Sequence, residues 1–384
     1  MKIMAFLKRA ALAISRRAAW FLCVLLPIRR ERIVVSNFVG RGYGDNPKYI
    51  VEELLSKGDG LEIVWLVKDR KEALTLPEGV KSCDIRSPLG AYYMATAGVW
   101  IDNCRRNFIF KRKKQLYIQT WHGFALKRIE KDVSDKLPKS YVRTAVHDSK
   151  HIDVMVSCSS FMTEIYKKAF WYEGDVLKIG APRNDLLLGD RTQASKKVRE
   201  EFSLDDGSGI ILYAPTFRAD GSLQPYSVDY KRLINACGEK FKRDFAVLVR
   251  IHPDIIEKCQ SLSFGPSVIN ASYYPDVQEL LAAADVVISD YSSLMFDFAL
   301  TGKPCFQFAT DIEEYKKDRN FYFRLDELPF ALAVDNDGLE RNILSFEEKE
   351  YKQGLERFYE EVGMVRDGSA SRKCAELVIK HCGK

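Results

Sequence analysis

The chain has 384 residues, a length that favours two domains of ordinary size. Hydrophobic residues make up 46% and charged residues 29%, with ordinary glycine and proline contents, which excludes a mainly disordered, collagen-like or low-complexity chain. The net charge of +6 comes from residues 1–32, where eight basic residues face one acidic residue, so nucleic-acid binding by the whole protein is not implied.

Residues 1–30 mix basic and apolar residues. The longest uncharged run, Ala18–Ile28, has 11 residues, well short of the roughly 20 that a membrane-spanning helix needs. A cleaved signal peptide fits poorly, because charges interrupt the apolar run and no small-residue cleavage site follows it. We expect an amphipathic helix that lies on an anionic membrane surface. The alternative is a helix packed on its own domain.

Two series of short apolar runs alternate with helical patterns and predict buried parallel strands. The first series is Arg32–Phe38, Glu62–Val67, Val99–Asp102, Leu116–Thr120, Asp153–Cys158 and Val176–Gly180. The second is Gly209–Ala214, Phe245–Ile251, Ser267–Ile269, Val286–Ser289 and Cys305–Phe308. Helices are predicted over Pro47–Ser56, Ser160–Phe170, Tyr230–Glu239, Asp276–Ala284 and Ser292–Thr301. This alternation indicates two doubly wound α/β domains.

The domain boundary is expected near Leu186–Lys197. Residues 1–30 then form the amphipathic helix, 31–190 the first domain and 191–384 the second. The last stretch, Ser345–Lys384, reads as helical with a break at Gly363–Ser369 and is assigned to the second domain. Ligands of such folds bind outside the carboxyl ends of the strands, and here we expect them in the cleft between the domains.

Two of the five histidines directly follow predicted strands. His122 follows LYIQT, and His252 follows FAVLVRI in the equivalent place in the second domain. Histidine is the commonest general acid or base, so this pairing favours a catalytic role for both. His147, His151 and His381 lie in polar helical contexts and are interpreted as surface residues.

Other polar groups also follow strands. Arg183, in the GAPRND turn, suits a phosphate oxygen or an exposed pair with Asp185. Pro215 and Thr216 end a strand in YAPTFR, and Arg250 adds a cation beside His252.

The segment SDYSSLMFD places Ser292 and Ser293 at the start of a helix, with Asp297 one turn inside it. This is either an anion cradle or a plain helix N-cap. GRGYGD, residues 40–45, lacks the ending of a Walker motif. The strand-end groups together suggest an anionic ligand with a pyrophosphate.

Metal and disulfide chemistry have little support. The nine cysteines are scattered without a CxxC pair, which favours reduced thiols over a disulfide framework or a zinc site. No acidic pair is arranged for a metal ion. We therefore expect no metal site and no other cofactor, and a Mg²⁺ ion held loosely with the ligand stays open.

Five motifs occur in an order that is specific to one family. They are QTWHGFALKRIEKD (119–132), GAPRND (180–185), ILYAPTFR (211–218), RIHP (250–253) and DVQELLAAADVVISDYSSLMFDFALTGKP (276–304). With SNFVGRGYGDNPKYI (36–50), they give the chain a resemblance to the CDP-glycerol glycerophosphotransferases, a family of teichoic-acid and capsule polyol-phosphate transferases. The resemblance covers roughly residues 32–375.

This resemblance implies a GT-B fold, with two Rossmann-like domains facing a central cleft. The first would serve the acceptor and the second would bind the CDP donor. The implied reaction moves glycerol phosphate or ribitol phosphate from its CDP-activated form to a hydroxyl of a lipid-linked saccharide acceptor, and CMP leaves. Members lie on the cytoplasmic face of the cell membrane as peripheral proteins.

The motifs also imply roles for individual residues. His122 would be the general base, and His252, with Arg250, would stabilise the pyrophosphate or the leaving CMP. The implied substrate-binding positions are Trp121, Gly123, Phe124, Ala125, Arg183, Pro215, Thr216, Arg250, Ile251, Ser292, Ser293 and Asp297. Tyr291 either packs on the cytosine or fills the core.

The chain departs from the family pattern beside His122. The usual WHGTPLK reads WHGFALK, so Phe124 and Ala125 replace Thr and Pro, and a usual Gly reads Glu130. These changes bear on which polyol is carried. The chain also lacks the long N-terminal region of the large polymerases, so a primase or short transferase fits as well as a polymerase.

Two other functions stay open on the sequence. One is a GT-B glycosyltransferase or epimerase with a different nucleotide-sugar donor. The other is a non-catalytic scaffold of the same fold. The choice between CDP-glycerol and CDP-ribitol, the acceptor and the oligomeric state are not determined by the sequence.

Overall fold

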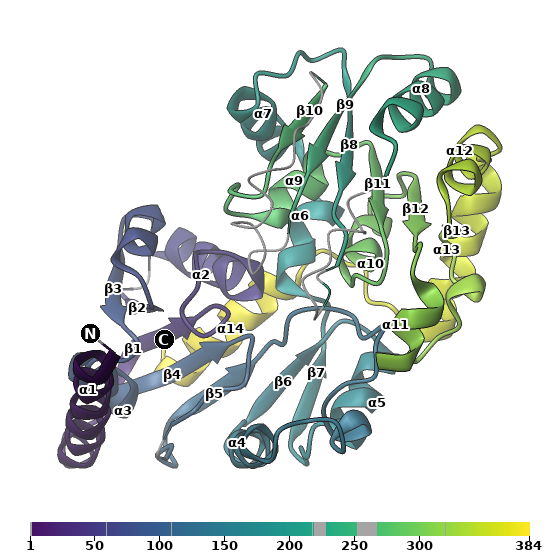
Figure 1. Cartoon of the computed structure of the whole chain (residues 1–384). Helices are drawn as coiled ribbons and strands as arrows, with labels where there is room; N and C mark the ends of the chain where they lie inside the picture. The colour runs from purple at the N-terminus through teal and green to yellow at the C-terminus, as the bar shows by residue number, and fades with distance from the viewer. Residues whose placement is uncertain are drawn as a thin grey trace. The chain divides into compact units, whose positions relative to one another are not determined.

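The computed structural model describes residues 2–58, 60–108, 110–216, 218, 228–251, 267–318 and 320–384. The chain forms two compact units. The first contains residues 1–122, 129–185 and 367–384, and the second contains residues 123–128 and 186–366. Each unit is built on one parallel sheet (Figure 1). The predicted fold class is thereby confirmed: two α/β units of the Rossmann-like kind that GT-B proteins combine.

The first sheet has seven strands in the order β3-β2-β1-β4-β5-β6-β7, and each neighbouring pair is parallel. The strands are β1 (Arg29–Ser36), β2 (Glu62–Val67), β3 (Val80–Asp84), β4 (Ala97–Asp102), β5 (Leu116–Gln119), β6 (Val154–Ser157) and β7 (Asp175–Lys178). The order reverses between β1 and β4, which is the topological switch point of a doubly wound sheet.

Helices connect and cover these strands. They are α1 (Lys2–Cys23), α2 (Asp45–Lys57), α3 (Pro88–Thr96), α4 (Lys139–Ser149), α5 (Ser160–Ala169), α14 (Ala370–Cys382) and the short 3-10 helices η1 (Arg70–Thr75), η2 (Glu130–Val133) and η3 (Pro182–Asn184). The central strands read as continuous apolar runs because side chains on both of their faces are buried, as Ile33, Val34 and Val35 of β1 are.

The second sheet has six parallel strands in the order β10-β9-β8-β11-β12-β13. They are β8 (Gly209–Tyr213), β9 (Phe245–Val249), β10 (Val268–Asn270), β11 (Val286–Ser289), β12 (Cys305–Phe308) and β13 (Ala331–Ala333). Counted from its own first strand, this order is 3-2-1-4-5-6, the dinucleotide-binding order, with its switch point between β8 and β11.

The helices of the second unit follow the same alternation. They are α7 (Thr192–Glu201), α8 (Tyr230–Phe241), α9 (Val277–Ala283), α10 (Leu294–Ala299), α11 (Ile312–Asp318), α12 (Asn336–Leu344), α13 (Glu348–Val362) and the 3-10 helix η6 (Leu325–Glu327). The short helix α6 (Asp185–Leu188) begins where the chain passes from the first unit to the second, at the start of the predicted boundary region.

The units differ from the predicted domains at two places. Helix α14 was expected in the second domain, but it packs on α2 and the first sheet (Figure 1). Its side chains Cys374 and Val378 are fully buried in the same core cluster as Ile33, and this apolar face holds the end of the chain on the first unit. Residues 123–128, which follow His122, cluster with the second unit.

The edge strands β3 and β13 were not predicted. In β3 the exposed residues Lys81 and Ser82 interrupt the apolar pattern. Strand β13 has only three residues, too few to show a pattern. Both lie at the edge of a sheet, where one side of the strand has no neighbour to bury it.

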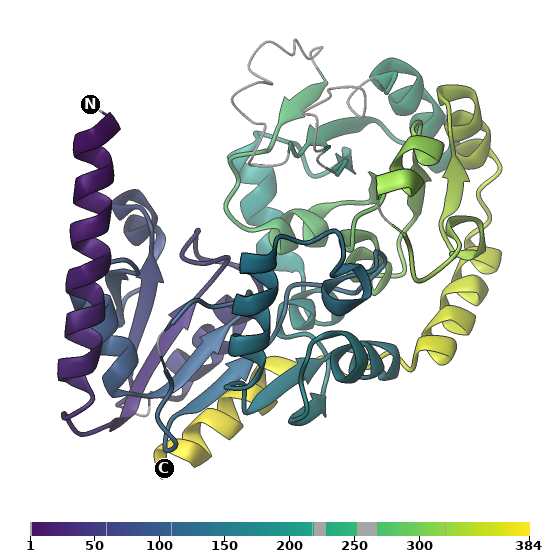
Figure 2. The same ribbon diagram turned by 60° about the horizontal axis from the view of Figure 1, so that its bottom comes forward.

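Helix α1 is one unbroken helix that packs against α3 of the first unit (Figure 2). Trp20 anchors it: only 1% of this residue is exposed, and its ring meets those of Trp100 and Phe110 edge-on. Other apolar residues at and beyond its end, such as Leu22 and Leu25, are exposed. Within the described residues, no helix is long and apolar enough to cross a bilayer.

Candidate active site

His122 lies where the sequence predicts it, just past the carboxyl end of β5. Strands β4 and β5 are neighbours, so the loop that follows β4 lies beside it. The backbone carbonyl oxygen of Asn103, in that loop, is 2.6 Å from His122 Nδ1. A carbonyl oxygen can only accept a hydrogen bond, so Nδ1 carries the proton and Nε2 keeps its lone pair.

The surroundings of His122 favour its neutral form. Burial lowers the pKa of this imidazole below its usual value. Its ring stacks on that of Trp121, with centroids 4.3 Å apart, and lies 5.3 Å from the ring of Phe38. The Cys104 thiol is 3.6 Å from Nδ1. A neutral imidazole with a free Nε2 lone pair is the form that a general base requires.

The loop around His122 is held by polar contacts on both sides. Trp121 has a φ of 53°, a conformation unusual for a bulky residue. Its N–H donates to the side-chain oxygen of Gln119 at 3.0 Å, and its carbonyl accepts from the Asn46 amide at 3.0 Å. These bonds stabilise a strained turn directly before the histidine.

Arg183 is buried and forms an ion pair with Asp45, with 2.5 Å between Nη1 and Oδ2. Its N–H also donates to Asn46 Oδ1 at 3.0 Å. The alternative of an exposed pair with Asp185 is wrong, because Asp185 accepts from the N–H groups of Ala370 and Ser371 at the start of α14. Arg183 therefore ties the GAPRND turn to the loop that contains residues 40–45.

Asn46 is a residue that the sequence analysis missed. Its side chain bridges Trp121 and Arg183, and so joins two of the predicted motifs. The segment SNFVGRGYGDNPKYI carried the signal, because it stood out without a role for any of its residues.

In the second unit, the motifs YAPTFR and SDYSS meet at the switch point between β8 and β11. Thr216 donates to Asp290 Oδ1 from its N–H at 2.8 Å and from its hydroxyl at 2.5 Å. Arg218 pairs with Asp290 at 2.7 Å and with Asp311 at 2.5 Å. The sequence analysis assigned no role to Asp290 or Arg218, although both lie inside motifs that it singled out.

Ser292 and Ser293 lie in the turn between β11 and α10, as predicted, and both are partly exposed. Ser293 is the N-cap residue, and the Leu294 N–H donates to Ser292 Oγ at 3.4 Å. Asp297 is buried inside the helix and accepts from Gln278 Nε2 at 3.3 Å. The two hydroxyl residues are thus partly exposed, whereas the Asp297 carboxylate is buried.

Among the described residues at the end of β9, one is a cation. Arg250 is partly exposed and donates to the Tyr274 carbonyl at 2.8 Å. Ile251 was expected to contact the substrate, but its side chain is fully buried in the core and cannot do so directly. His252 lies outside the described residues. Pro215 is buried at the end of β8, directly before Thr216.

Three predicted or possible ligand contacts are buried by packing within the second unit. Phe124 is only 4% exposed and packs with Phe296, Phe323 and Phe358, and Ala125 is buried beside it in sequence. Of the two readings of Tyr291, core packing is the observed one. Its ring is buried 3.9 Å from that of Tyr315, and its hydroxyl donates to Asp311 at 3.0 Å.

His147 and His151 were expected on the surface, but both are partly buried. Their rings lie 4.6 Å apart and both contact Phe108, so they belong to the packing of α4. In the part of the chain that the structure describes, no group of three histidine, cysteine or acidic side chains is arranged to hold a metal ion.

Comparison with known proteins identifies the family. Residues 18–380 match the family described as CDP-Glycerol:Poly(glycerophosphate) glycerophosphotransferase. The chain is 30% identical over 371 residues to the teichoic acid poly(glycerol phosphate) polymerase of Staphylococcus epidermidis; the match covers 92% of this chain and 51% of that protein. The chain thus spans about half the length of that polymerase.

Two further relatives match over nearly their full length. The teichoic acid ribitol-phosphate primase of Bacillus spizizenii is 24% identical, with 97% of each chain covered. Among solved structures, a histidine variant of the wall teichoic acid polymerase TagF, soaked with CDPG, is 27% identical with a TM-score of 0.86, covering 100% of this chain and 97% of that one. The chain therefore belongs to the CDP-glycerol:poly(glycerophosphate) glycerophosphotransferase family.

Proposed function

We propose that this protein transfers a polyol phosphate from a CDP-activated donor to a hydroxyl of a lipid-linked saccharide acceptor and releases CMP. Family membership supports the reaction class. The observation that carries the assignment of roles is the hydrogen bond from His122 Nδ1 to the Asn103 carbonyl, because it leaves Nε2 able to accept a proton.

In the proposed step, Nε2 of His122 takes the proton of the acceptor hydroxyl. The hydroxyl oxygen then attacks the phosphorus that bears the polyol, and a new oxygen–phosphorus bond forms. The bond from this phosphorus to the bridging oxygen breaks, and CMP leaves with that oxygen. Such transfers depend chiefly on positioning and on neutralisation of phosphate charge.

The second unit is proposed to bind the CDP donor, and the first to serve the acceptor. Three partly exposed residues at the strand ends of the second unit would donate hydrogen bonds or charge to the pyrophosphate: Arg250, Ser292 and Ser293. Thr216, whose N–H and hydroxyl both donate to Asp290, would contact the donor through its hydroxyl oxygen. His252 remains proposed as the group that stabilises the leaving CMP. The other predicted contacts are buried, and each would hold the site residues of its own unit in place: Trp121 and Arg183 in the first unit, Pro215 and Asp297 in the second. Gly123 would leave space beside His122.

The donor is proposed to be CDP-glycerol or CDP-ribitol, since the relatives include enzymes named for each polyol. The test offers both donors in turn to the purified chain with a lipid-linked saccharide acceptor and measures CMP and the polyol phosphate attached to the acceptor. Coupled appearance of both products with one donor supports the proposal. Binding of neither donor, or transfer of a sugar from another nucleotide donor, would refute it.

We also propose that the protein sits on the cytoplasmic face of the cell membrane through α1. Trp20 fixes this helix to the first unit, while Ile14, Phe21, Leu22 and Leu25 leave a row of apolar side chains exposed. Basic residues at both ends of this row suit anionic headgroups. The packed-helix alternative thus accounts for one face of α1 and leaves the other for a lipid surface.

A further inference from the structure

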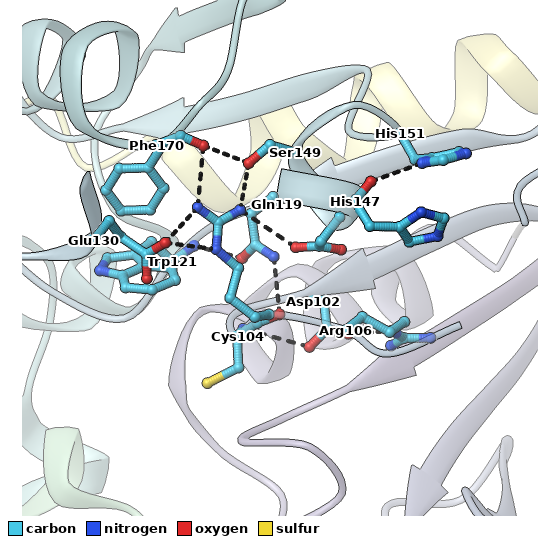
Figure 3. A network of polar contacts seen from close by, with 12 residues as sticks. Asp102, Cys104, Arg106, Gln119, Trp121, Glu130, His147, Ser149, His151 and Phe170 are labelled. Atoms are coloured by element: carbon cyan, nitrogen blue, oxygen red, sulfur yellow. Dashed lines mark hydrogen bonds and ion pairs between the residues drawn. The ribbon is translucent and has the colours of Figure 1, made fainter. Parts of the chain in front are cut away.

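A buried ion pair lies next to the loop that holds His122. Arg105 follows β4, and Glu130 begins η2; both are almost completely buried. Arg105 donates to Glu130 Oε2 from Nε at 3.1 Å and from Nη2 at 2.8 Å (Figure 3). A buried arginine with two bonds to one carboxylate has a single preferred orientation.

The remaining donors of Arg105 are also used. Nη1 donates to Ser149 Oγ at 2.7 Å and lies 3.4 Å from Asp148 Oδ2, while Nη2 also reaches the Phe170 carbonyl at 3.2 Å. Figure 3 shows Glu130, Ser149 and Phe170 converging on this one centre. The guanidinium is thus fixed by elements from three parts of the first unit.

This fixed group touches the surroundings of His122 in two ways. Arg105 is two residues after Asn103, whose carbonyl sets the tautomer of His122. The guanidinium carbon also lies 5.7 Å from the centre of the Trp121 ring, on which His122 stacks. A shift of Arg105 would therefore move both the hydrogen-bond acceptor and the stacking partner of the histidine.

The strained backbone of Glu130 indicates that specific contacts hold its carboxylate. Its φ is 55°, the left-handed region where glycine is favoured and other residues are strained. Here the strained glutamate bonds to Arg105 and, through its other oxygen, accepts from the Tyr141 hydroxyl. These contacts offset the strain that a glycine would avoid.

We propose that Arg105 and Glu130 form a positioning pair that holds His122 in the orientation and tautomer needed to take a proton. The pair acts through Asn103 and Trp121 and does not touch the substrate. This inference rests on the proposed function for its catalytic consequence, but the state of His122 can be measured without turnover.

The charges that act on His122 give a second readout. Glu130 and Asp45 raise the pKa of His122, and Arg183 lowers it, while burial is the largest influence and lowers it. Loss of the Glu130 charge alone should therefore lower the pKa of His122 further. Because this charge acts through space whatever its structural role, the lower pKa reports the loss of charge, whereas a changed tautomer or a lower kcat reports that His122 has moved.

The test compares Glu130→Gly, which relieves the backbone strain, with Glu130→Gln, which keeps the side-chain shape and removes the charge. The matched control is Glu62→Gln, which breaks the pair of buried Arg32 near the opposite ends of β1 and β2. For each protein, kcat and KM are measured by CMP release, and the His122 tautomer and pKa by ¹⁵N NMR with histidine labelling.

Both Glu130 variants should lose about 10–100-fold in kcat with little change in donor KM, as expected when a reacting group is misplaced. Both should also show a lower pKa for His122, and Glu62→Gln should show neither change. If Glu130→Gly does not fold, the result for Glu130→Gln alone tests the inference. Wild-type kcat together with an unchanged His122 tautomer in the folded variants would overturn the inference. If the wild-type chain releases no CMP, the proposed function fails, and the NMR readouts still test the positioning.

Discussion

The two sheets share a strand order but use their carboxyl ends differently. In the first unit, His122 is a neutral ring whose tautomer is set by a backbone carbonyl and whose loop is braced by buried pairs. In the second unit, Thr216 donates to the buried acid Asp290, and the partly exposed Ser292 and Arg250 follow the strands β11 and β9. The same topology can thus hold one reacting group rigidly or present several hydrogen-bond donors to an anion.

The sharpest way to break this comparison is to remove the proposed base. His122→Asn should lower kcat by about 100–10,000-fold, the usual contribution of a general base, with a small change in donor KM. Activity is measured as CMP release at saturating donor. The control is His381→Asn on α14, which changes the same residue type in the same unit; its neighbour Cys382 bonds to Arg30 at the amino end of β1, opposite the carboxyl ends that His122 follows. A near-normal kcat of the His122 variant would contradict the assignment of the reacting group to the first unit.

The network in the second unit should be important for stability. Arg218→Met leaves Asp290 and Asp311 without their buried partner and should lower the free energy of unfolding by about 3–5 kcal/mol. Arg232→Met is the matched control, because Arg232 also pairs with two acids but has 40% of its side chain exposed, so the loss should be below about 1 kcal/mol. Denaturant unfolding measures both. Equal losses would show that burial of the Arg218 cluster confers no special stability.

Helix α1 provides the smallest expected effect. Leu25→Glu places a charge on a residue that is 85% exposed, so the fold should persist while binding to anionic vesicles weakens by about tenfold, the result of losing roughly 1.4 kcal/mol of apolar burial. Vesicle co-sedimentation measures this. Leu74→Glu is the control, since Leu74 is 86% exposed in the same unit but far along the chain from α1. Equal effects of both variants would argue against a specific role for α1.

Much of the fold could be predicted, because central strands of a parallel sheet have long apolar runs and turn residues mark their ends. The same reasoning placed His122, Thr216 and Ser292 at strand ends. Strand β3 was missed because exposed polar residues interrupt its apolar pattern, and β13 because it has only three residues, whereas the other edge strands, β7 and β10, were predicted.

Contacts between distant residues could not be predicted in this way. Asn46 lies 75 residues before Trp121, and Asp290 lies 72 residues after Arg218, so each pair depends on how the strands are ordered in the sheet. Phe124 and Ile251 stood in ligand-binding motifs, but their apolar side chains were more stable in the cores. A motif identifies a segment, whereas the packing decides which of its side chains face a ligand.

The most direct test of the claim that His122 is the general base compares the pKa of His122 from two measurements. The structure predicts that burial holds the pKa of His122 below its usual value near 6.5. Because a base must be unprotonated, kcat/KM for CMP release should be constant at neutral pH and fall only as the pH drops through that lowered pKa. The pKa of His122 from ¹⁵N NMR should coincide with the acid limb of the pH–rate profile. An acid limb above pH 6.5, or one unrelated to the measured pKa of His122, would contradict the account.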